Sequence, residues 1–114
     1  MSNKKNSQIR VDVTTNENHI PEKIIWNADE GDIKDAEAKA MIMSLWDGKT
    51  HTAMRIDIWN QEMTIDEMKK FFHQTLLTMS DTFERATGER NIAEDLRDYC
   101  QHFAEKMGLL PPQS

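Results

Sequence analysis

The residue types that most often carry chemistry are few in this chain, and none falls at a spacing that builds a metal site. Its four histidines are His19, His51, His73 and His102. No two of them have the His-x-x-x-His spacing of a zinc-binding helix, and with one cysteine there is no Cys-x-x-Cys pair. We therefore expect no bound metal and no cofactor.

The single cysteine, Cys100, is the only candidate for a thiolate nucleophile. A catalytic cysteine needs a base and a lowered pKa, commonly at a helix N-terminus. Cys100 instead lies in the middle of a predicted helix, between Tyr99 and Gln101. We expect a buried or half-buried structural side chain.

Paired carboxylates do acid–base chemistry in many enzymes, and the chain has an acidic cluster at Glu94, Asp95 and Asp98. Arg97 lies among them on the outer face of a predicted helix, which is typical of a solvated surface. Glycine-rich phosphate loops and Gly-x-Ser-x-Gly elbows are absent from the sequence. The sequence predicts a protein that is not an enzyme, although distant residues that converge in space would leave no such pattern.

The charge balance excludes several classes of partner. The formal net charge is −6, and cations are adjacent only at Lys4-Lys5 and Lys69-Lys70, so phosphate backbones and anionic membranes are repelled. Residues 1–10 lack the apolar core of a signal peptide, and no run approaches the ~20 apolar residues of a membrane-spanning helix. We expect a cytoplasmic protein that neither binds nucleic acid nor inserts into a membrane.

Two segments near the start have the pattern of β-strands. Between residues 8 and 14, Ile9, Val11 and Val13 alternate with polar residues, which predicts a half-buried strand. Residues 23–28 form a short β-branched and aromatic run that predicts a second strand.

The next segment, residues 33–46, is ambiguous. Its alanines favour a helix over about 33–43, whereas Asp47-Gly48 followed by another apolar run favours a hairpin. We expect strands over about 39–46 and 51–59, and the helix stays open as an alternative.

The expected register of this hairpin sorts its side chains onto two faces. A four-residue loop over 47–50 places Trp46 opposite His51 and Met43 opposite Met54. One face then carries the apolar residues Met41, Met43, Leu45, Met54, Ile56 and Ile58. The other face carries Trp46, Arg55, Asp57 and Trp59.

Tryptophan and arginine on an uncovered sheet face are typical of a protein–protein interface, because interface anchors are enriched in both. We therefore assign partner binding to the face of Trp46, Arg55, Asp57 and Trp59, and a homodimer is one form that this binding can take. The alternative is that loops and the tail cover this face, or that Trp46 packs locally on the hairpin.

A short internal similarity links two strands. Arg10-Val11-Asp12 resembles Arg55-Ile56-Asp57. If the two strands were antiparallel neighbours, Arg10 would lie opposite Asp57 and Asp12 opposite Arg55.

The second half of the chain predicts two helices. Thr64-x-x-Glu67 is a capping box, and the apolar residues after it recur every three or four positions, which predicts a helix over about 64–86. The same spacing predicts a second helix over about 90–107, with Gly88 and Gly108 as helix ends. The short link makes the two helices antiparallel neighbours.

Strands followed by helices predict the α+β class. We expect a mainly antiparallel sheet of about four strands, followed by a C-terminal helical hairpin packed on one face. The length allows one domain, over residues 8–107, between a flexible N-terminus at 1–7 and a tail at 108–114.

Several segments together resemble a known family. They are HIPEKIIW at 19–26, AKAMIMSLWD at 38–47, RIDIW at 55–59, DEMKKFF at 66–72 and DTFERA at 81–86. The resemblance, over about residues 8–107, is to the gliding motility-associated GldC family. It implies a small cytoplasmic component that accompanies the gliding machinery, and it carries over no catalytic residue.

The expected function follows from the residue patterns and from the family resemblance together. We expect a non-enzymatic accessory or adaptor protein that contacts a protein of the gliding or associated secretion machinery. The alternative is a small-ligand-responsive regulatory domain with a pocket between sheet and helices.

Overall fold

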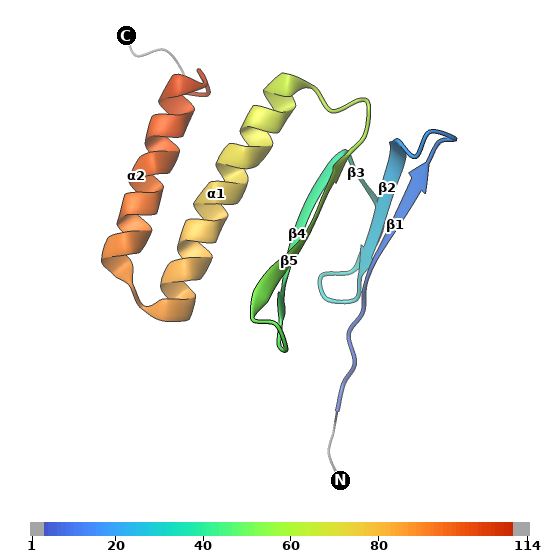
Figure 1. Ribbon diagram of the computed structural model, residues 1–114, viewed down its shortest axis with the longest axis horizontal. Helices are drawn as coiled ribbons and strands as arrows, with labels where there is room; N and C mark the ends of the chain where they lie inside the picture. The colour runs from blue at the N-terminus through green and yellow to red at the C-terminus, as the bar shows by residue number, and fades with distance from the viewer. Residues whose placement is uncertain (1–3, 111–114) are drawn as a thin grey trace. The chain divides into compact units, whose positions relative to one another are not determined.

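The computed structural model describes residues 4–110, in which five strands precede two helices (Figure 1). The predicted α+β class is confirmed. The predicted termini, 1–7 and 108–114, lie partly outside the described residues. The elements are β1 (Ile9–Thr15), β2 (Pro21–Ala28), β3 (Ile33–Ala38), β4 (Ala40–Asp47), β5 (Thr52–Trp59), α1 (Ile65–Thr87) and α2 (Arg90–Lys106).

The internal contacts of the chain form two compact units. One unit ends at Met63 and holds the strands, and the other begins at Thr64 and holds the helices. One domain over 8–107, with the helical hairpin packed on the sheet, stays a prediction.

The strands form two antiparallel sheets. β1, β2 and β3 make a three-stranded sheet in that order, and β4 pairs with β5 in a two-stranded sheet. The sequence predicts about four strands in one sheet. The antiparallel pairing agrees with this prediction, but the structure divides the strands into two sheets. This division occurs at Lys39, where the extended segment from β3 to β4 bends and exchanges β2 for β5 as its pairing partner.

The ambiguous segment contains strand β3, which is irregular. Trp26 pairs with Ala36 and Ala28 with Ile33, so a bulge lies between these pairs. Within it, Asp35 has a left-handed φ of 49° and donates its backbone N–H to Asn27 Oδ1 at 2.9 Å. Pairing with β2 overrides the helix propensity of the alanines, and the helix over 33–43 is therefore wrong.

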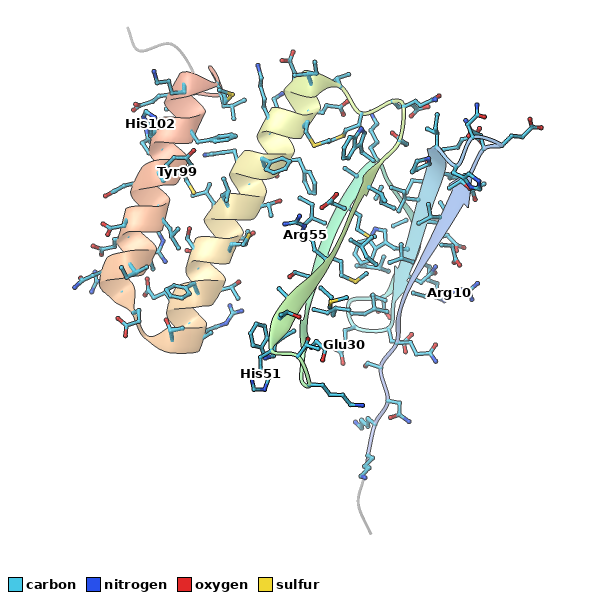
Figure 2. All side chains as sticks on the ribbon, in the orientation of Figure 1. Arg10, Glu30, His51, Arg55, Tyr99 and His102 are labelled. Carbon is cyan, nitrogen blue, oxygen red and sulfur yellow. The ribbon has the colours of Figure 1, made fainter. Side chains whose placement is uncertain are left out.

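The best-buried residue of the strand unit lies on its central strand. Ile24 of β2 is 1% exposed and shares a face with Trp26 and the buried Ala28. Outside this core, Arg10 and Arg55 project from opposite sides of the strand unit (Figure 2).

The register of the β4–β5 hairpin differs from the predicted one by two residues. Trp46 pairs with Ala53 and Met43 pairs with Ile56, so the four-residue loop runs from 48 to 51. The predicted pairs and loop bounds are therefore wrong. Because side chains alternate with a period of two, this shift leaves every residue on its predicted face.

The two Arg-x-Asp strands are not neighbours, since β1 and β5 belong to different sheets. The expected cross-strand ion pairs do not form. Each arginine instead contacts the aspartate two residues along its own strand. Arg10 Nε lies 3.0 Å from Asp12 Oδ2, and Arg55 Nε lies 3.0 Å from Asp57 Oδ2.

The helices begin and end within one residue of the predicted bounds. The capping box is present: Glu67 N donates to Thr64 Oγ1 at 3.0 Å, and Thr64 N donates to Glu67 Oε1 at 3.2 Å. Gly88 ends α1 with φ 74°, and Gly108 follows α2 with φ 68°. The two helices form an antiparallel hairpin (Figure 1).

The helical unit buries small side chains of α2. Ala93, Cys100 and Ala104 are each 1% exposed or less, and their spacing puts them on one helix face. This face is turned to α1, because Arg97 between them forms ion pairs with carboxylates of α1. The expectation of a buried Cys100 is confirmed.

Candidate protein-interaction face

The structure brings the four predicted interface residues together on one face of the β4–β5 hairpin. Trp46 extends from β4, and Arg55, Asp57 and Trp59 extend from β5. The register pairs Trp46 with Ala53 and Arg55 with Ser44, and directly paired residues point to the same side of a sheet. We call this surface, consisting of these four residues with Ile42, Ser44 and Ala53, the tryptophan face.

The tryptophan face is open in the structure. Trp46 is 68% exposed and Trp59 is 55% exposed, and Ile42 beside them is also exposed. Large aromatic side chains are normally among the more buried residues of a small domain. Two tryptophans exposed together on one strand pair are therefore the feature that marks this face as a candidate interaction surface.

Trp46 makes a local contact at the hairpin loop. Its ring stacks on His51, with the ring centres 6.2 Å apart and the planes 21° from parallel. His51 has a left-handed φ of 56°, and histidine is among the residues found there more often than most. This contact matches part of the local-packing alternative, but it leaves most of the indole exposed.

The centre of the tryptophan face is electrostatically balanced. Arg55 and Asp57 form their ion pair along β5, and both side chains are largely exposed. A guanidinium carries five N–H donors, and this pair uses the Nε group. The arginine therefore keeps directional donors with which a partner's carboxylates or carbonyls can bond.

Asp47 fixes the loop at the end of this face. Its Oδ1 accepts the backbone N–H groups of Lys49 at 2.7 Å and Thr50 at 3.1 Å. These bonds stabilise the charged carboxylate, so they lower the pKa of Asp47 below its ordinary value, with Lys49 the larger cause.

The other residue types considered for chemistry do not converge. His19 and His51 lie in turns of the strand unit, whereas His73 stacks on Phe103 within the helical unit. Glu94, Asp95 and Asp98 are exposed on α2. Within residues 4–110, no group of three or more histidine, cysteine or acidic side chains is placed to hold a metal ion.

A pocket of about 470 Å³ lies where the chain switches between the sheets. Its lining is Glu22, Lys23, Ile24, Glu37, Ala38, Lys39, Asn60 and Glu62. Lys23 and Glu37 pair at 3.4 Å, and the buried Asn60 donates its N–H to the Lys39 carbonyl at 2.8 Å. Asn60 Oδ1 accepts two further backbone N–H groups. The sequence does not predict this pocket, because nothing in the residue pattern marks the bend at Lys39.

Comparison with known proteins identifies the family. The model of the gliding motility-associated protein GldC-like family matches residues 21–109. The chain belongs to the GldC-like family. The predicted resemblance is thereby confirmed, and membership indicates a part in gliding motility.

The GldC-like match extends from β2 past the end of α2, so it includes the whole tryptophan face. β1 precedes the matched region. No curated protein and no solved structure matches the chain. Neither α1 nor α2, the helices found in residues 4–110, has the length and apolarity needed to cross a membrane.

Proposed function

We propose that this GldC-like protein is a non-enzymatic adaptor of gliding motility that works in the cytoplasm by protein–protein contact. The partner is a protein of the gliding machinery or of its associated secretion apparatus. The tryptophan face is the contact surface, with Trp46 and Trp59 as apolar anchors and Arg55 and Asp57 between them.

The observation that supports the proposal is the exposure of two tryptophans around an Arg–Asp pair on one strand pair. Tryptophan and arginine are enriched among the few residues that dominate the binding energy of an interface. A balanced ion pair beside them adds specificity more than affinity, since surface charges mainly select and orient partners.

The test compares partner recovery by the intact protein and its variants. Tagged protein is crosslinked in native cells, purified, and its co-purified proteins are quantified by mass spectrometry. We expect one component of the machinery in near-equal amount with the unchanged protein. Trp59→Ala and Arg55→Ala should each reduce that component at least about tenfold, as loss of interface anchors does.

The matched control is Arg10→Ala, which removes the equivalent arginine of the same Arg-x-Asp motif on β1. It should leave recovery unchanged. Circular dichroism verifies that each variant is folded. Equal recovery by the folded Trp59→Ala, Arg55→Ala and unchanged proteins rejects the tryptophan face.

A further inference from the structure

The free edge of β5 is a second surface of the same hairpin. β4 and β5 form a sheet of only two strands, and no strand of residues 4–110 pairs with the outer edge of β5. A two-stranded sheet is marginally stable alone, and three or more strands are the usual requirement. An unpaired edge also offers a row of N–H and C=O groups to another chain.

The hydrogen-bond pattern shows which backbone groups lie on that edge. Asn60 N donates to Lys39 O at 2.8 Å, which places Asn60 and Lys39 in a hydrogen-bonded position of the ladder. In an antiparallel ladder such positions alternate, so Ile58 and Ile56 also direct their backbone groups to β4. Arg55 and Asp57 therefore direct their N–H and C=O groups outward.

We propose that β5 pairs antiparallel with β5 of a second copy of this chain, across a two-fold axis at Ile56. A closed dimer requires one patch that complements itself, and this register supplies one. Arg55 lies opposite Asp57 of the second copy, and Asp57 lies opposite Arg55. At the same positions the outward backbone groups form hydrogen-bonded pairs.

The remaining side chains suit the same register. Ala53 lies opposite Trp59 of the second copy, so a small residue faces a large one on the tryptophan face. On the other face, Met54 lies opposite Ile58 and the two Ile56 residues meet at the axis, so apolar residues face each other.

The edges of β1 and β4 are less suited to pairing between two copies of the chain. β1 carries the similar Arg10-x-Asp12, but it already belongs to a three-stranded sheet. Asp29 N donates to Gln8 O at 3.1 Å, so by alternation the backbone groups of Arg10 and Asp12 are directed to β2. The β4 edge presents no charged pair that would fix a register.

The resulting assembly joins two hairpins into one sheet in the order β4-β5-β5-β4. It places two tryptophan faces side by side for a common partner, which raises avidity without a new contact. The dimer does not rest on the proposed adaptor role, because the purified chain tests it without any partner.

Charge exchange on the purified full chain tests the pairing. We expect sedimentation equilibrium to show a dimer for the unchanged protein. R55D puts carboxylates opposite each other, and D57R puts guanidinium groups opposite each other. Each should weaken the dimer by roughly 10- to 100-fold in dissociation constant, whereas R55D/D57R restores opposite charges and the dimer. R10D breaks the matched ion pair of β1 and should change nothing.

Crosslinking tests the register. The two Ile56 residues occupy a non-hydrogen-bonded position, where Cα atoms are about 4.5 Å apart, within the range of a disulfide. In a Cys100→Ala background, I56C should form a covalent dimer under mild oxidation, and S44C on β4 should not. A monomer at every concentration, or a folded R55D/D57R that stays monomeric, overturns the proposal. Equal crosslinking of I56C and S44C rejects the axis at Ile56.

Discussion

Arg97 of α2 reaches across the helical hairpin to Glu84 of α1, with Nη2 2.8 Å from Oε1. The same guanidinium lies 2.9 Å from Asp81 Oδ1. These contacts raise the pKa of Arg97, with the hydrogen bond to Glu84 the larger cause and that to Asp81 the second. The sequence indicates a solvated arginine among the carboxylates of its own helix, whereas the structure pairs it with those of the other helix.

Arg97→Ala should destabilise the helical hairpin, because it removes both interhelical ion pairs and leaves Glu84 and Asp81 near each other without a cation. The urea midpoint, followed by circular dichroism at 222 nm, should fall. Arg90→Ala is the control, since Arg90 Nε pairs at 3.1 Å with Glu94 Oε1 of its own helix. An equal loss in both variants would show that the interhelical position adds nothing.

Asp47 should make the stability of the strand unit depend on pH in the acidic range. Its pKa is lower in the fold than its ordinary value of 3.8, so its contribution is complete above pH 3.8 and is lost as the pH falls through the folded value. Urea titrations between pH 2 and 6 measure this loss. Asp47→Asn keeps an oxygen that can accept the loop N–H groups but does not titrate. An unchanged pH profile in that variant would assign the acid sensitivity to other carboxylates.

Ile24→Ala should be among the most damaging substitutions in the strand unit. Ile24 is 1% exposed on the central strand, and deleting a buried isoleucine side chain costs about 2–5 kcal/mol. Chemical denaturation with a near-ultraviolet tryptophan signal measures the free energy of unfolding. Ile9→Ala is the control, because Ile9 is 78% exposed and should cost much less. Similar losses at the two positions would contradict the assigned core.

Thr64→Ala should weaken the start of α1. The threonine side chain accepts the Glu67 N–H in the capping box, and loss of such a cap costs about 1 kcal/mol. Thr64→Ser retains the hydroxyl and should restore nearly all of that stability. Hydrogen exchange at the first turn of α1 locates the effect. Protection that stays the same in Thr64→Ala would remove the capping box as a stabilising feature.

Local patterns in the sequence were sufficient for the helices and for the two faces of the hairpin. The capping box and Gly88 act within a few residues, so the bounds of α1 follow from neighbours along the chain. The alternation of β4 and β5 has a period of two, so Trp46 and Trp59 fall on one face even when the register moves by two residues.

Only the tertiary structure decided which strands pair and which side chains contact each other across elements. Helix propensity leaves β3 undetermined, and its strand conformation depends on pairing with β2 and on the bulge at Asp35. The bend at Lys39 that divides the strands into two sheets depends on which strands compete for the two halves of one segment. Arg97 contacts α1 because helix packing brings together residues far apart in sequence. Such pairings are set by three-dimensional proximity, and a residue pattern records only what is near along the chain.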